Sequence, residues 1–171
     1  MSQKIRQMQI AFVPIQDRLM FRLRTTAQAE FKLWFTRRYV KLLWPAVQQM
    51  LNNIKSEIIS DLHTRQAVIS WEHEQVLTQV DFQTQYKEEP EISRPLGEEP
   101  VLVSEIQVKH GADNTQMLCL RPEHGQGIEI VFDSTLLHTF CKLLEEGVQK
   151  ANWDLEYRIG DYTLPVSRTA H

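Results

Sequence analysis

The sequence predicts an α+β fold made of duplicated β-β-β-α units, in which an amphipathic helix covers each antiparallel sheet. The main observation is that residues 31–51 and 128–148 follow one pattern. Each stretch begins with apolar residues in alternate positions, the period of a strand with one buried face. Each then reaches a typical helix N-cap, Thr36 or Asp133, and changes to helical spacing. The predicted core comprises Phe31, Leu33, Phe35, Val40, Leu43, Val47, Ile128, Ile130, Phe132, Leu137, Phe140 and Leu144.

Composition is consistent with this class. The 171 residues are 42% hydrophobic and 24% charged, which is ordinary for a globular protein and suits one domain or two halves that share a core. The apolar run at 9–15 is much shorter than the roughly 20 residues of a membrane span, and it predicts a strand. Two cysteines, Cys119 and Cys141, indicate no disulfide framework. We therefore expect a cytoplasmic protein with no membrane partner.

The first unit is predicted to begin with three strands, at residues 8–15, 18–24 and 30–35. Short polar turns between them favour an antiparallel meander, whose inner face needs a helix to cover it. The helix that begins after Thr36 is the natural cover. Pro45 removes one helical hydrogen bond and predicts a kink near Lys41. The apolar spacing continues beyond it through Ile54, Ile58 and Leu62. A second helical segment is predicted at 64–80, with apolar positions at Val68, Trp71 and Val76 or Leu77.

The second unit follows an acidic linker at residues 83–100, whose three internal prolines and glycine exclude a helix or a central strand. Strands are predicted at 101–110, 116–121 and 127–132, and a helix from Asp133 to about Asn152. A short hairpin or packed tail could follow Trp153. The predicted organisation is a first repeat with its extended helical segment at 1–82, the linker at 83–100, a second repeat at 101–152 and a C-terminal tail at 153–171.

Sequence motifs give little support for an enzyme or a metal protein. The pair Gly125 and Gly127 lacks the third glycine of a nucleotide-binding loop, and His73-Glu74 lacks the second histidine of a zinc-protease motif. We considered one metal site on a single helix face, formed by His138, Cys141 and Glu145. A core-flanking role for these positions is the preferred interpretation. We therefore expect no catalytic residues, no metal and no cofactor.

The start of the first predicted helix is the most informative local feature. Arg37 and Arg38 occupy its first turn, where the helix dipole is already positive and cations are unfavourable. The second helix has Ser134 and Thr135 in the corresponding positions. One interpretation is that the arginines are merely solvated. The other is an anion site, in which the free backbone N–H groups and two guanidinium groups receive a phosphate or carboxylate.

Charge is concentrated at the N-terminal end of the chain. Residues 1–45 carry nine Lys or Arg and two acids, although the net charge of the whole chain is −3. Alternation places several of these cations on the outer face of the first sheet, around Trp34. The predicted surface for an anion or acidic partner comprises Arg18, Arg22, Arg24, Lys32, Trp34, Thr36, Arg37 and Arg38. Such an asymmetry indicates either an acidic partner or self-complementarity within the chain.

We therefore expect a non-enzymatic interaction module that engages an acidic protein, or its own acidic segment, through this basic surface. Partly apolar outer faces, with Met20 and Met117 among their residues, also predict a homodimer. The alternative is a single-stranded nucleic-acid-binding protein. Two sheet-plus-helix units about a pseudo-twofold axis resemble the whirly and PUR-type architecture, which implies single-strand binding. That resemblance is one of fold only, because those units usually carry four strands and no family motif is present.

Overall fold

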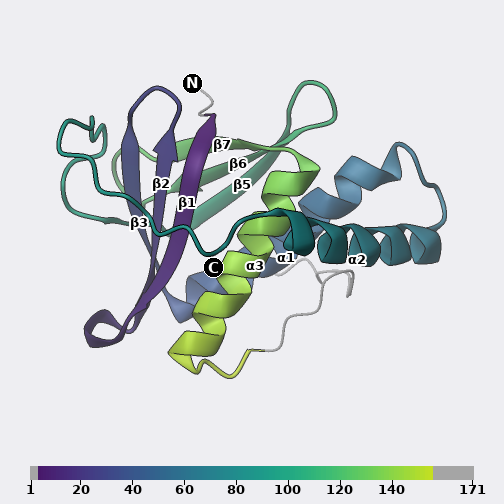
Figure 1. The fold of residues 1–171 in the computed structure, drawn as a ribbon, viewed down its shortest axis with the longest axis horizontal. Helices are drawn as coiled ribbons and strands as arrows, with labels where there is room; N and C mark the ends of the chain where they lie inside the picture. Colours follow the sequence, from purple (N-terminus) through teal and green to yellow (C-terminus); the bar gives the residue numbers. More distant parts are fainter. Residues whose placement is uncertain (1–3, 156–171) are drawn as a thin grey trace.

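The computed structural model describes residues 4–155 and has an α+β fold (Figure 1). The strands are β1 (Ile5–Val13), β2 (Arg18–Thr25), β3 (Glu30–Phe35), β4 (Val101–Leu102), β5 (Glu105–His110), β6 (Gln116–Arg121) and β7 (Ile128–Phe132). The helices are a short 3-10 helix, η1 (Pro14–Gln16), and the α-helices α1 (Arg37–Ser56), α2 (Leu62–Gln79) and α3 (Ser134–Ala151). Within residues 4–155, no helix combines the length and apolar character needed to cross a membrane.

Two sheets account for all seven strands of the described chain. The first is mixed, in the order β1-β2-β3-β4, with β4 parallel to β3; the second is antiparallel, in the order β5-β6-β7. The predicted core is confirmed, since its twelve residues are all at most 5% exposed. The predicted N-caps are confirmed too. Thr36 Oγ1 accepts a hydrogen bond from Tyr39 N–H at 3.1 Å, and Asp133 Oδ1 accepts one from Leu136 N–H at 2.8 Å.

The predicted strand at 101–110 proves to be two strands in different sheets. Val101 and Leu102 pair with β3, and Val103 N–H still donates to Trp34 O at 3.3 Å. Ser104 N–H then donates to Arg121 O at 2.9 Å, and β5 continues in the second sheet. The change of partner takes place within residues 103 and 104, which belong to neither strand. An alternating sequence could not reveal the break, because side-chain alternation is the same in either sheet.

Each large helix packs mainly on the sheet of the other unit, which differs from the prediction that each helix covers the strands preceding it. Helix α3 lies chiefly against β1 and β2, and α1 lies against β5 and β6 (Figure 1). The Phe21 and Phe140 rings meet edge to face, with centroids 5.2 Å apart. Tyr39 of α1 donates its hydroxyl hydrogen to Glu105 O at 3.1 Å. Helical spacing defines which face is buried, not which sheet it meets, so both units share one core.

The first helix is shorter than predicted, and the second is more exposed. Helix α1 passes through Pro45 but ends at Ser56. Asp61 then caps α2 by accepting a hydrogen bond from Thr64 N–H at 2.8 Å. The second helix predicted at 64–80 is therefore confirmed as Leu62–Gln79, whereas the predicted continuation of the first helix through Ile58 and Leu62 is wrong. Ile58 is 71% exposed and Trp71 is 61% exposed, whereas Ile69 and His73 are the buried residues of α2. Trp153 is buried and Leu155 packs against the core, and residues 156–171 of the predicted tail lie outside the described residues.

Candidate binding surface on the first sheet

The outer face of the first sheet carries the predicted cations of β2 and β3. Strand register pairs Met20 with Trp34, Arg22 with Lys32, and Arg24 with Glu30. These residues alternate with the buried inner-face residues, so they project from the opposite face. The name basic face is used below for Arg18, Arg22, Arg24, Lys32 and Trp34.

Glu30 is the buried centre of this surface. It is 2% exposed, and its carboxylate accepts hydrogen bonds from Arg22 at 3.2 Å, from Arg94 at 3.1 Å and from the Tyr86 hydroxyl at 2.8 Å. The Lys32 ammonium lies 3.7 Å away. Burial on its own raises the pKa of Glu30, but the two hydrogen bonds from Tyr86 and Arg94 and the nearby cations outweigh it, so the pKa lies below its ordinary value. Glu30 is therefore an ionised carboxylate with several partners.

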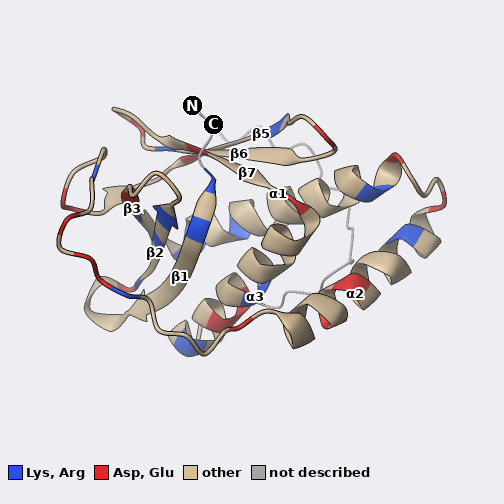
Figure 2. Cartoon of the chain, turned by 45° about the horizontal axis from the view of Figure 1, so that its top comes forward, with Lys and Arg blue, Asp and Glu red and all other residues tan. Residues whose placement is uncertain are grey.

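The acidic linker covers part of the basic face. Glu88 pairs with Arg22 at 3.3 Å, Glu89 pairs with Arg24 at 3.2 Å, and Arg24 also donates to Lys87 O. Figure 2 shows the acidic residues of the linker where it passes beside the first sheet. As a result Arg24, predicted to lie on an open surface, is only 2% exposed.

An aromatic ring completes this contact. The Arg22 and Arg24 guanidinium carbons lie 4.4 Å and 5.1 Å from the centroid of the Tyr86 ring, within the range of cation–π attraction. Burial, with the hydrogen bond to Glu30, raises the pKa of Tyr86, so its hydroxyl remains a neutral donor. The segment Tyr86–Glu89 thus presents an aromatic ring and two carboxylates to two adjacent arginines.

Backbone hydrogen bonds hold the linker beyond this contact. Glu30 N–H donates to Ser93 O at 2.8 Å, and Ser93 N–H donates to Gln28 O at 3.1 Å. Ile92 next to this bridge is buried. The linker contains no helix and no named strand, yet it is attached to the start of β3 at several points.

The other predicted residues lie toward the opposite end of the sheet. Thr36 follows Phe35, which pairs with Leu19, whereas Glu30 pairs with Arg24. Five residues of strand separate the two ends by about 17 Å. Arg37 and Arg38 are exposed, and neither forms an ion pair within the described part of the chain. A single carboxylate cannot reach both groups of cations, but an extended anionic chain can.

The apolar part of the outer face lies between those two groups. Met20 and Trp34 pair across β2 and β3 and are partly exposed, and Leu102 beside Trp34 is 44% exposed. Arg18 and Lys32 flank this row and are also partly exposed. This region therefore offers an aromatic ring, aliphatic surface and cations to a ligand.

Sequence reasoning missed the second polar cluster, a buried histidine pair. His138 was considered with Cys141 and Glu145 as a metal site, but its Nδ1 lies 3.0 Å from His73 Nδ1 on α2. Cys141 instead contacts the Gln48 amide, at 3.9 Å. No group of three potential ligands that could hold a metal occurs in residues 4–155. The available signal was the i, i+4 spacing of Ile69 and His73, which places them on one helix face.

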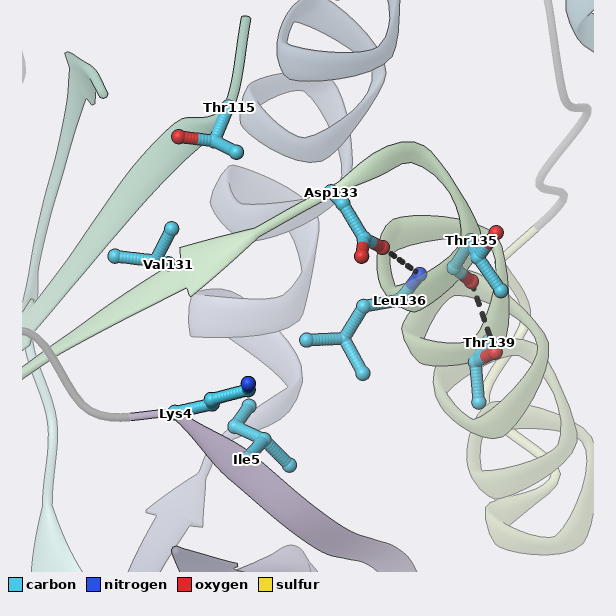
Figure 3. A pocket seen from close by; sticks show the side chains of 8 residues that line it. All are labelled: Lys4, Ile5, Thr115, Val131, Asp133, Thr135, Leu136 and Thr139. Carbon is cyan, nitrogen blue, oxygen red and sulfur yellow. Dashed lines mark hydrogen bonds between the residues drawn. The ribbon is translucent and has the colours of Figure 1, made fainter. Parts of the chain in front are cut away.

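A pocket of about 490 Å³ lies between the start of β1, the end of β7 and the first turns of α3 (Figure 3). Two of its polar residues bond within the start of α3: Asp133 accepts from Leu136 N–H, and Thr139 donates to Thr135 O at 2.9 Å. Lys4 and Ile5 border it from the side of β1. The pocket pairs no nucleophile with a base, so the basic face is the better candidate for a functional site.

Comparison with known proteins gives no further guidance on function. No family model, no curated protein and no solved structure matches the chain significantly.

Proposed function

We propose that the chain is a non-enzymatic binding module whose basic face engages an acidic partner and whose acidic linker is an intramolecular ligand for the same face. The observation that carries this proposal is the contact of Tyr86–Glu89 with Arg22 and Arg24. The linker already contains the chemistry that a partner would need. A partner with several carboxylates could replace Glu88 and Glu89, which are at least 39% exposed, and extend past Trp34 toward Arg37 and Arg38.

The energetic balance favours such an exchange. Exposed ion pairs typically contribute about 0.2–1 kcal/mol each, because water and salt screen them. Glu88 is exposed and pairs with the partly exposed Arg22, so it can be displaced at little cost. Glu89 pairs with the buried Arg24, so an incoming carboxylate must take its place there, while the buried Glu30 stays as the anchor of the site. Arg22 and Arg24 also each have a buried Nε with no hydrogen-bond partner within the described chain. An incoming anion that reached those donors would gain hydrogen bonds that the linker does not make.

Neutralising two linker glutamates tests the proposal. Glu88→Gln with Glu89→Gln should strengthen binding of fluorescently labelled poly-L-glutamate at least about twofold, because at least about 0.4 kcal/mol of competing interaction is removed. The matched control is Glu91→Gln with Glu99→Gln, which makes the same charge change at two exposed linker positions. Fluorescence anisotropy measures both. Equal gains in the two variants would assign the effect to net charge, and no binding by any variant would contradict the proposed function.

Single-stranded nucleic acid is the second candidate, and the observation that favours it is Trp34. The indole lies partly exposed beside Lys32 and across from Met20, and bases stack on aromatic residues that cations flank. An oligo-deoxythymidine arm in the same titration separates the two candidates. Nucleic-acid binding should quench Trp34 fluorescence and weaken steeply with salt. The net charge of −3 opposes both anionic ligands alike. The acidic protein ranks first because carboxylates already pair with Arg22 and Arg24, whereas Trp34 is the single aromatic residue of the basic face.

We also propose that the two β-β-β-α units arose by duplication. Support comes from their common order, since a three-strand meander leads through an N-cap into a long helix in each unit. Helix α1 packs on the second sheet and α3 on the first, which is consistent with a pseudo-twofold relation between the units. Under this proposal, the basic face and Arg37-Arg38 are features that the first unit acquired and the second did not.

A further inference from the structure

A pair of buried histidines joins helices α2 and α3. His73 is 8% exposed and His138 is fully buried, and their Nδ1 atoms lie 3.0 Å apart. At this distance one Nδ1 must donate and the other must accept, so the neutral pair shares one hydrogen between these atoms. The contact is therefore a hydrogen bond that depends on the protonation of both rings.

Few groups around the two histidines could stabilise the positive charge that protonation of either ring would add. Glu72 Oε2 is 3.7 Å from His138 Nε2, but the Glu72 carboxylate already pairs with Lys55 of α1 at 2.5 Å and accepts from Ser134 Oγ at 3.3 Å. His138 Nε2 is buried without a hydrogen-bond partner in the described chain. The other charged neighbours are Glu74 of α2 and Lys142 of α3, which act on His73 with opposite signs.

The closed state is defined here as the one in which α2 packs on α1 and α3. Protonation of the first histidine and protonation of the second destabilise it in different ways. The first places a net charge in a buried site whose carboxylate is already neutralised by a lysine. The second puts a hydrogen on both Nδ1 atoms, so that two N–H groups face each other and the hydrogen bond is lost. In an open state both rings would be hydrated and would accept protons near the ordinary pKa of about 6.5.

Helix α2 is the element most easily released. Its only buried residues within the described chain are Ile69 and His73, and it packs on α1 and α3, outside the two sheets (Figure 1). Elements with few buried apolar contacts open locally at a lower free energy than the core. Helices α1 and α3, by contrast, bury many large residues in the shared core.

We propose that the His73–His138 pair is a proton-sensitive latch, whose protonation releases α2 from α1 and α3 while the sheets and the other two helices remain folded. The latch does not depend on the proposed binding function, and the two proposals are tested independently. Burial, reinforced by the neighbouring His73, lowers the pKa of His138 to about 4, and burial lowers the pKa of His73 also. Because these pKa values are lowered in the closed state, its stabilisation is complete above about pH 6.5 and is lost as the pH falls toward 4.

Hydrogen exchange of the α2 amides tests the latch, with rates corrected for the intrinsic effect of pH. Protection of α2 should fall at least about tenfold between about pH 7.5 and pH 4.5, since a single proton with a pKa shift of one unit already gives a factor of ten. Protection of α1, α3 and the strands should persist over that range. Constant protection of α2 would overturn the proposal, and so would loss of protection in all elements together, which would indicate global acid unfolding.

The variant His73→Gln tests whether the histidine pair causes the pH dependence, because it removes one of the two titrating rings. A glutamine amide can donate or accept, so it can bond to His138 in either protonation state without a charge of its own. Helix α2 of this variant should lose less protection than the wild type between about pH 7.5 and pH 4.5, because His138 still titrates but no second ring adds a proton. His63→Gln is the matched control, because His63 is exposed on the same helix, and it should behave like the wild type. Loss of protection in His73→Gln equal to that of the wild type would contradict the latch.

A measurement on the unmodified chain keeps the test decisive if that variant does not fold. Nitrogen-15 NMR of the imidazole rings reports their tautomers and their titration. The latch requires both rings to be neutral near pH 7, with one Nδ1 protonated and the other not, and both to titrate below about 6.5. Titration of either ring at or above 6.5 would overturn it.

Discussion

Replacing Phe140 by alanine should lower the free energy of unfolding by about 3–5 kcal/mol, as truncation of a fully buried aromatic residue does. Phe140 of α3 has no exposed surface, and its ring lies 5.2 Å from that of Phe21 and 5.5 Å from that of Phe132. It therefore contacts both sheets, and the cavity would lie where the two units meet. Urea unfolding followed by circular dichroism measures the change.

A control variant and a double-mutant cycle test whether the loss of stability comes from the packing of α3 on the first sheet. Phe12→Ala is the control, because Phe12 is only partly buried, and it should cost clearly less. In a cycle of Phe21→Leu and Phe140→Leu, the two rings should show a coupling energy of about 0.5–1.5 kcal/mol, as aromatic pairs in contact do. Strict additivity would mean that α3 does not lie on β2.

Replacing Glu30 by glutamine should cost about 3–5 kcal/mol, because it removes one partner from a buried charge cluster. Arg22, Arg94 and Lys32 would keep their charges around an uncharged amide. Chemical unfolding near pH 7 measures the loss. The control Glu91→Gln alters an exposed linker carboxylate and should change stability by no more than about 0.5 kcal/mol.

The difference in unfolding free energy between the wild type and Glu30→Gln should also depend on pH, in a direction that can be stated. Because the pKa of Glu30 lies below its ordinary value of 4.5, its ionised form stabilises the folded state fully above pH 4.5, and the contribution is lost as the pH falls through the folded-state pKa. The stability gap between the wild type and Glu30→Gln should therefore narrow in acid. A gap that stays constant or widens below pH 4.5 would show that the charge of Glu30 is not what stabilises the cluster.

Local sequence signals predicted the features that depend on neighbouring residues. Alternation in β3 and helical spacing in α3 identified the buried faces, and Thr36 and Asp133 marked the helix starts. These signals work because backbone geometry sets which side chains share a face. The same reasoning explains why Arg22 and Arg24 were expected on the outer face, where β2 carries them.

Features that depend on distant segments could not be predicted in this way. No local sequence pattern shows that α1 and α3 each pack on the sheet of the other unit. None shows that the chain passes to the second sheet after Leu102. Arg24 was expected to be exposed, but it is buried because residues far along the chain lie over it. The His73–His138 contact likewise joins two helices that no spacing rule relates.

The most direct test of the binding proposal is whether a ligand and the acidic linker exclude each other. Two backbone hydrogen bonds report on the attached linker, from Glu30 N–H to Ser93 O and from Ser93 N–H to Gln28 O. Hydrogen exchange of these two amides should be measured without and with saturating poly-L-glutamate, using oligo-deoxythymidine as the second probe. Competition for Arg22 and Arg24 predicts that exchange of the Ser93 amide accelerates when the probe binds. Saturating binding that leaves both amides as protected as in the free protein would contradict the account, because the partner would then bind without displacing the linker.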